Sequence, residues 1–350
     1  MRLLVLCSLI PVVAVLADPV STIDTSSIKF EDKQGYLKSV LKELDIDPSS
    51  QVLVFSKSSL QGQISPKNPR AIYFNEHTYV AFIPTAPMLE VMSVHPSKGP
   101  QFYTILNKAG GAKLEGHQEF LCFRCHGGGS SKVPSQLFAT SSHVAPSGYP
   151  RLESRAVLVT AETPFENRWG GWYVTGLHGK MRHMGNTTST PPDEAPKLNR
   201  DVGANITDLS QFFDTKKYLT PHSDLVALMV MEQQMAVQNA LSAVAMSPTD
   251  AGIDRLVSLL LCENELKLDS PVKGTSGFTE YYSQRYPKDS KGRSLGQLDL
   301  NSRLLKYPCS PLVYSATFKE MSVRDRVIAK LREKASPEVR EILSATLPGF

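Results

Sequence analysis

The chain has 350 residues, of which 41% are apolar and 21% charged, and this ordinary globular composition excludes a wholly disordered, collagen-like or coiled-coil protein. Its 38 Lys and Arg residues exceed its 34 Asp and Glu residues by only four, and no basic run is long enough to predict nucleic-acid binding. The length allows one large domain or two smaller ones. Composition and charge therefore identify no partner.

The first seventeen residues have the three-part pattern of a secretory signal peptide. A positive start at Met1-Arg2 precedes an apolar run over 3–16, and small residues lead to a cleavage point after Ala17. The run is shorter than the roughly 20 apolar residues that span a bilayer, although a retained N-terminal anchor is the alternative. We expect a mature chain that begins at Asp18, has no transmembrane segment, and is periplasmic or extracellular.

The first half of the mature chain is dominated by short β-type runs. Apolar residues at helical spacing predict one helix over 32–44 before them. Strands are then predicted over 52–55, 71–74, 79–82, 88–94 and 102–106, with a hairpin turn at 75–77 and a further strand pair at 137–144 and 152–160. These runs predict an antiparallel sheet.

A C-x-x-C-H motif, Cys122 to His126, follows the strands. In an exported chain this spacing is typical of covalent haem attachment, because the two thiols can bond the porphyrin vinyl groups while the histidine ligates the iron. A thioredoxin-like redox pair would need a helix at the motif, but Gly127 to Gly129 follow it. A zinc site would need two more close ligands. We therefore predict one haem c on Cys122, Cys125 and His126, with His126 as the proximal iron ligand.

The segment 169–184 concentrates residues suited to the other side of a haem. It holds both tryptophans of the chain, and its candidates for a distal pocket are Trp169, Trp172, His178, His183 and Met184. One of His178, His183 and Met184 is the expected distal iron ligand. The alternative for each histidine is a hydrogen-bonded residue of the core that does not ligate iron.

The rest of the chain is mainly helical. Helices are predicted over 224–245, 250–262, 322–334 and 337–345 from apolar spacing and start signals. Cys262 and Cys309 could form a disulfide in an oxidising compartment. The predicted fold class is α+β, with a signal peptide at 1–17, a β-rich haem-binding region at 18–200 built around the attachment loop, and a mainly helical region at 201–350 that packs on it.

Five segments resemble an uncharacterised family of exported, planctomycete-type bacterial proteins with a single-haem cytochrome c domain. They are 64–74, 122–126, 169–186, 292–295 and 306–310. The resemblance covers about residues 50 to 320. It implies export and one c-type haem, it assigns roles to Cys122, Cys125 and His126 alone, and it implies no substrate.

Two functions follow from these expectations. The first is a monohaem electron carrier that passes single electrons between a soluble redox partner protein and a membrane electron-transport chain. The second is a haem enzyme or small-ligand sensor, acting on peroxide or a small nitrogen or sulfur compound at an open or labile distal site. The length favours the second, since a simple carrier needs only about 100 residues. The lack of a recognisable second cofactor motif favours the first.

Overall fold

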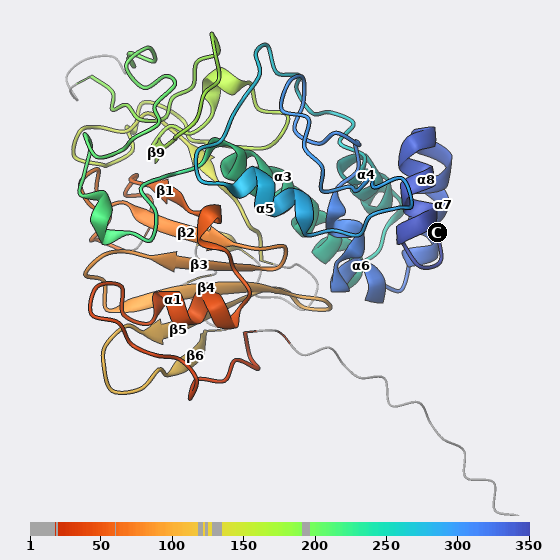
Figure 1. The fold of residues 1–350 in the computed structure, drawn as a ribbon, viewed down its shortest axis with the longest axis horizontal. Helices are drawn as coiled ribbons and strands as arrows, with labels where there is room; N and C mark the ends of the chain where they lie inside the picture. Colours follow the sequence, from red (N-terminus) through yellow and green to blue (C-terminus); the bar gives the residue numbers. More distant parts are fainter. Residues whose placement is uncertain are drawn as a thin grey trace, which may run out of the picture.

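The computed structural model describes residues 18, 20–59, 61–117, 122, 125–127, 135–190 and 197–350. The predicted signal peptide therefore lies outside the described residues. Within them, one antiparallel sheet and a set of helices make an α+β fold, as the sequence predicts (Figure 1). No helix in the described ranges combines the length and the apolar character needed to cross a membrane.

The central sheet has seven strands in the order β6-β5-β4-β3-β2-β1-β9. Its strands are β1 (Val52–Val54), β2 (Arg70–Phe74), β3 (Thr78–Phe82), β4 (Met88–His95), β5 (Gly99–Leu106), β6 (Leu114–His117) and β9 (Trp172–Tyr173). From β1 to β6 each strand pairs with the next along the chain, so the hairpin predicted at 75–77 is confirmed. The closing strand β9 returns from far along the chain to pair with β1.

Alternation along the strands divides the sheet into two buried faces. One face is covered by α1 (Leu37–Glu43), whose Val40 and Leu41 share a core with Tyr73, Val80 and Val91. The opposite face is covered by α3 (Leu225–Met246), which packs on a second set of strand side chains, including Val52, Phe74, Tyr79 and Met92. The long helix therefore lies across the sheet on the side away from α1.

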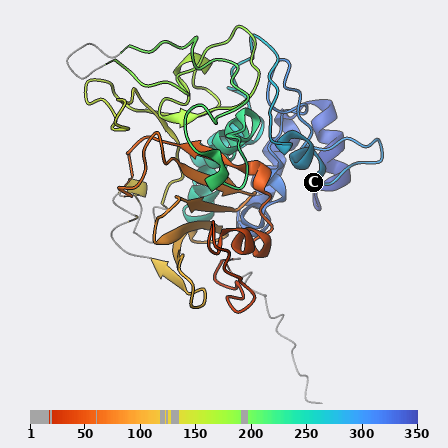
Figure 2. The same ribbon diagram turned by 60° about the vertical axis from the view of Figure 1, so that its left-hand side comes forward.

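Four helices form a separate apolar core around the second half of α3: α4 (Asp250–Leu260), α6 (Ala316–Glu320), α7 (Arg324–Lys334) and α8 (Pro337–Thr346). Val237, Leu241 and Val244 of α3 pack there against α4, α7 and α8. The helix α5 (Phe278–Gln284) instead places Phe278 and Tyr282 in the sheet-side core. In both views α4, α6, α7 and α8 lie beside the sheet, while α3 reaches from the sheet into this group (Figures 1 and 2).

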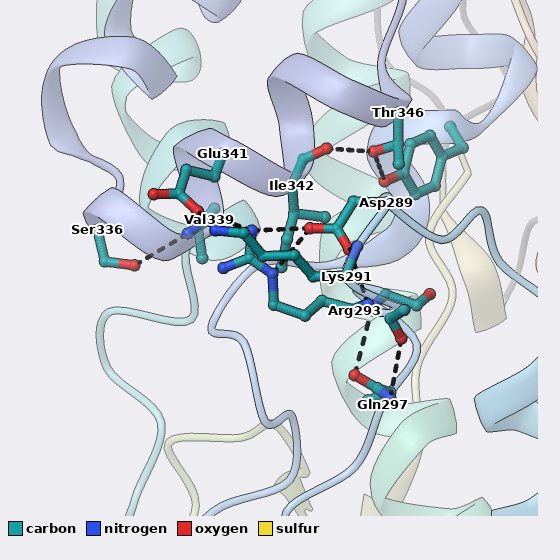
Figure 3. Close-up of polar contacts among 12 residues, drawn as sticks. Asp289, Lys291, Arg293, Gln297, Ser336, Val339, Glu341, Ile342 and Thr346 are labelled. Atoms are coloured by element: carbon teal, nitrogen blue, oxygen red, sulfur yellow. Dashed lines mark hydrogen bonds and ion pairs between the residues drawn. The ribbon is translucent and has the colours of Figure 1, made fainter.

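An ion-pair network attaches the loop after α5 to α8 (Figure 3). Glu341 on α8 accepts from Lys291 at 2.9 Å and from Arg293 at 2.7 Å, and Arg293 also pairs with Asp289 at 2.7 Å. Lys291 and Glu341 are solvent-exposed, so their ion pair contributes little, whereas the Arg293–Asp289 pair is largely buried.

A second, two-stranded sheet lies outside the main one. Its strands β7 (Thr140–Ser141) and β8 (Val157–Leu158) pair antiparallel, within the two regions predicted as a longer strand pair. Each strand has only two residues, because Pro146, Gly148 and Pro150 occupy the turn region between them and Pro cannot donate to a ladder.

Candidate functional site

The motif residues lie on the α3 side of the sheet. The ring of His126 packs between those of Phe102, on β5, and Phe138, with 5.0 Å between ring centroids in each case. Phe102 pairs with Met92 across the ladder and so belongs to the face that α3 covers. The strand meander and the segment after the motif therefore position the imidazole together.

Two hydrogen bonds fix the orientation of His126. Its Nδ1 lies 2.8 Å from the carbonyl oxygen of Gln136, and the Gln136 amide donates to the His126 carbonyl at 2.8 Å. A carbonyl can only accept, so Nδ1 carries the proton and the Nε2 lone pair is left available. Burial lowers the pKa of His126, which favours the neutral ring. Nε2 has no hydrogen-bond partner among the described residues.

The two thiols of the motif are accessible and unbridged. Cys122 is half-buried and Cys125 exposed, and both are free. Burial, with the negative charge of Glu90, raises the pKa of the Cys122 thiol. A redox-active C-x-x-C pair requires a lowered thiol pKa, so the environment of Cys122 disfavours that alternative. Two accessible thiols beside an imidazole with an available Nε2 are a donor set that fits a covalently attached haem.

The chain leaving the motif is fastened first to α3. The amide of Leu137 donates to Asn239 Oδ1 at 2.8 Å, and Asn239 Nδ2 donates back to the Leu137 carbonyl at 2.7 Å. Next, the Thr140 carbonyl accepts from Trp172 Nε1 at 2.8 Å, and Ser141 Oγ accepts from the Gly170 amide at 2.8 Å. One extended segment therefore connects the motif to the segment 169–184.

The backbone of that segment is shaped by its W-G-G-W sequence. Trp169 has a left-handed φ of 64°, and Gly171 follows with φ 89°. A Cβ at Gly170 would meet the Ser142 carbonyl oxygen at 2.2 Å, so only glycine fits there. The tight turn reverses the chain and delivers Trp172 to β9, beside β1.

Three of the five distal-pocket candidates meet in a buried aromatic cluster. The rings of Trp169, His178 and His183 surround Phe165. The centroid separations are 4.8 Å for His178–His183, 5.3 Å for Trp169–His183 and 5.0 Å for Phe165–Trp169. Trp172 instead lies on β9, and Met184 Sδ accepts a contact from Ser141 Oγ at 3.6 Å.

Hydrogen bonding occupies both nitrogens of His178 and one of His183. His178 Nδ1 is 2.9 Å from the Met181 carbonyl, and Nε2 accepts from the Asn205 amide at 2.9 Å. His183 Nδ1 accepts from the Gly185 amide at 3.0 Å, which places the proton of the neutral ring on Nε2. That Nε2 is buried without a partner, and burial lowers the pKa of His183 to about 3. In this arrangement neither histidine offers an available lone pair for a metal.

A buried carboxylate on α3 completes the cluster. Glu232 accepts from Trp169 Nε1 and pairs with Arg168 at 3.3 Å. Burial raises the pKa of Glu232 to about 7, outweighing the lowering effect of Arg168. Glu232 was not among the predicted site residues, although an acidic residue at the end of the apolar run L-V-A-L-M-V-M was an available signal.

The structure thus assembles two groups of predicted residues that do not touch. Among the described residues, none of Trp169, Trp172, His178, His183 and Met184 makes a hydrogen bond or ring contact with His126. The residues that do hold His126 were not predicted, since Phe102 and Phe138 resemble ordinary strand apolars in sequence and Gln136 acts through its backbone. Phe123 and Arg124 lie outside the described residues.

The cysteine pair of the second half is unbridged. Cys262 and Cys309 are both buried free thiols, so the possible disulfide between them is not formed in the structure. Gln233 donates to Cys262 Sγ at 3.7 Å, while burial raises the pKa of Cys262 to about 12. Packing in apolar surroundings accounts for both thiols without a bridge.

Comparison of the chain with protein-family models, curated proteins and solved structures finds no significant match.

Proposed function

We propose that this chain is an exported monohaem c-type cytochrome that carries out one-electron transfer. One haem c would be attached through Cys122 and Cys125, with His126 Nε2 as the proximal ligand. The observation that carries the proposal is the His126 geometry: Nδ1 is bonded to a backbone carbonyl, which orients the ring and leaves Nε2 available. When bound, the haem would supply an iron centre that takes up and releases a single electron.

The residues around the motif have roles that follow from their contacts. Phe102 and Phe138 hold the imidazole plane from two sides, and the Gln136 carbonyl increases the basicity of the ring through Nδ1. Redox partners would be a soluble protein or a membrane electron-transport chain, reached from the exposed side at Cys125.

Export is part of the proposal and rests on the pattern of residues 1–17. Asp18, the expected first residue of the mature chain, is buried and accepts from Ser93 Oγ at 2.5 Å and Tyr103 Oη at 2.7 Å. A mature chain beginning there would have its first side chain anchored on β4 and β5. N-terminal sequencing of the periplasmic protein should start at Asp18, and retention of Met1 in a membrane fraction would contradict cleavage.

A haem enzyme or small-ligand sensor is the second candidate function. It is favoured by the full use of the His178 nitrogens in hydrogen bonds and by the hydrogen bond that occupies Nδ1 of His183. If no side chain of that segment ligates iron, the sixth position would be open to peroxide or a small nitrogen or sulfur compound.

One experiment tests both functions. The protein is matured with c-type haem machinery, and its optical spectrum is recorded in the ferric, ferrous and ferrous-plus-carbon-monoxide states. Covalent haem that does not bind carbon monoxide supports the carrier, and ready carbon monoxide binding supports the enzyme or sensor. Absence of covalent haem contradicts both.

Variants separate the roles of the motif residues. Cys122→Ala and Cys125→Ala should each leave the haem on one thioether or lose it, and His126→Ala should remove the proximal ligand. His95→Ala is the matched control, because His95 lies at the end of β4 and its ring hydrogen-bonds, within the described part of the chain, to Ser97 alone. A native spectrum in His126→Ala, or loss of haem in the His95 control, would argue against the assignment.

A further inference from the structure

An open cleft of about 700 Å³ lies away from the motif, between the chain that follows the aromatic cluster and the chain that leads toward α3. The residues of its walls that matter here are Arg182, Thr188, Ser189, Lys197, Arg200 and Asp201. A cleft of this size is in the range of small-molecule sites. Its lining carries three cationic side chains and one carboxylate, which gives it a positive balance.

Among the side chains of this cleft, the guanidinium of Arg200 has hydrogen bonding that requires an explanation. Its Nε is buried without a partner, as are those of Arg70 and Arg324. Arg70, however, bonds to Glu90 through its terminal nitrogen, and Arg324 bonds to the Pro348 carbonyl. Arg200 makes no hydrogen bond or ion pair with any described residue. Because a half-buried guanidinium without an acceptor is costly, its position indicates a missing acceptor.

A second buried polar atom without a partner lies behind this wall. His143 Nδ1 is buried and unpartnered, and burial together with the charges of Arg200 and Arg151 lowers the pKa of His143. His143 is therefore near enough to Arg200 to be influenced by its charge. His143 lies behind the wall that contains Ser189. The Ser189 amide donates to the carbonyl of Val144, the residue after His143, at 2.8 Å. Arg151 is already paired with Glu153 at 3.2 Å, whereas no described carboxylate forms an ion pair with Arg200.

Two more donors of the cleft have no partner among the described residues. Lys197 has no ion pair among the described residues, and the hydroxyl of Thr188 has no hydrogen-bond partner there. The one carboxylate of the lining, Asp201, is already engaged by Arg182 Nε at 2.6 Å. Within the described part of the chain, the ammonium of Lys197, the guanidinium of Arg200 and the hydroxyl of Thr188 therefore have no acceptor.

From this arrangement we infer that the cleft binds an oxyanion group, phosphate-like or carboxylate, held by the guanidinium of Arg200 and the ammonium of Lys197. A planar guanidinium presents two parallel N–H donors to such a group, and Lys197 adds a point charge. Thr188 would supply a neutral donor at the rim. This inference is independent of haem attachment.

Isothermal titration calorimetry of the full mature chain tests the inference. Inorganic phosphate and malonate are titrated separately at low ionic strength, so that the two sources of oxyanion chemistry are distinguished. We expect saturable binding of at least one of them, weakened by added salt. Arg200→Gln should weaken that binding about tenfold to a hundredfold, as expected for loss of a charge-assisted hydrogen-bond pair.

Two further variants keep the test decisive if Arg200→Gln folds poorly. Lys197→Gln alters an exposed side chain and should weaken binding about tenfold without changing the thermal midpoint. Arg255→Gln, on the exposed side of α4, is the matched charge control and should bind like the wild type. Absence of saturable binding, or equal weakening in the Arg255 control, would overturn the inference. Binding that appears only after Asp193 and Glu194 are neutralised would also overturn it, because the chain's own carboxylates would then be the occupants.

Discussion

The two halves of α3 stabilise their surroundings in different ways. On the sheet side its buried polar residues bond to distant backbone and side-chain groups: Gln234 donates to the Asn75 carbonyl at 2.7 Å, and Gln238 accepts from Tyr79 Oη at 2.7 Å. On the helical side Leu241 and Val244 pack in an apolar core whose polar contacts lie at the surface.

This difference implies different responses to substitution. A buried polar group is costly when its partner is removed, whereas an exposed ion pair contributes little. Substitutions in the sheet-side network should therefore have large effects, and those in the surface pairs of the helical side small ones.

Removing the N-cap of α3 should have the largest effect. Asp224 Oδ1 accepts from the amides of Val226 and Ala227, and Oδ2 accepts from those of Thr275 at 2.6 Å and Ser276 at 2.9 Å. Asp224→Ala leaves these buried donors unpaired and should lower the free energy of unfolding by about 4 kcal/mol. Urea unfolding followed by circular dichroism measures the change.

The N-cap of α4 is the matched comparison on the helical side. Thr249 Oγ accepts only from the Gly252 amide at 3.0 Å, in an exposed position. Thr249→Ala should cost about 1 kcal/mol. Equal losses for the two caps would contradict the contrast between the two sides.

Glu232 should make the stability of the sheet side depend on pH. Its folded-state pKa of about 7 lies above the ordinary value of 4.5, so between these values the folded chain binds more protons than the unfolded chain. Raising the pH through this window therefore lowers stability, by about 2–3 kcal/mol from pH 5 to pH 8. Glu232→Gln should remove this contribution, as measured by urea unfolding at the two pH values.

His183 contributes to the pH dependence of stability with the opposite sign to Glu232. Its pKa is lowered to about 3, so the unfolded chain binds more protons than the folded chain below about pH 6.5, and stability rises with pH in that range. This contribution is common to wild type and Glu232→Gln and cancels in their difference. An unchanged pH slope in Glu232→Gln would count against a titrating Glu232.

Asn239→Ala tests the connection between α3 and the motif. It removes both hydrogen bonds to the Leu137 backbone and should cost about 2 kcal/mol. Hydrogen exchange should speed up at 135–141 before it does elsewhere. Asn301→Ala, at an exposed position, should change stability by less than about 0.5 kcal/mol. Uniform acceleration of exchange across the sheet would refute a local role for Asn239.

The smallest effect is expected at the network between the loop after α5 and α8. Glu341→Gln removes the ion pairs with Lys291 and Arg293, in which the Glu341 carboxylate itself is solvent-exposed (Figure 3). The thermal midpoint should fall less than in any variant above, and the difference should shrink at high salt because exposed pairs are screened. A loss that persists in high salt would show that Glu341 has a packing role.

Most of the fold was predictable because its long elements carry regular patterns. The strands over 52–106 are short β-type runs, and the helices over 224–245 and 250–262 have apolar residues at helical spacing and strong start signals. The structure confirms these elements, with their ends shifted by a few residues. The helices α5 and α6 and the strand β6 were not predicted. They have seven, five and four residues, which is too short for periodicity to be read.

The candidate site was predictable only where a local motif encodes it. The spacing of Cys122, Cys125 and His126 is local and was found, whereas the surroundings of His126 depend on Phe102, brought by strand pairing, and on a backbone carbonyl. Glu232 accepts a hydrogen bond from Trp169, although the two residues are 63 positions apart in the sequence. No spacing rule covers such contacts, since tertiary packing alone creates them.

The connection between Leu137 and Asn239 has a consequence for the timing of events in the chain. The two residues are 102 positions apart, whereas the meander from β1 to β6 is made of local pairings that form early. The segment after Cys125 therefore reaches its final position only after α3 has folded against it. Under the proposed function, haem attachment at Cys122 and Cys125 would therefore be easiest before α3 docks.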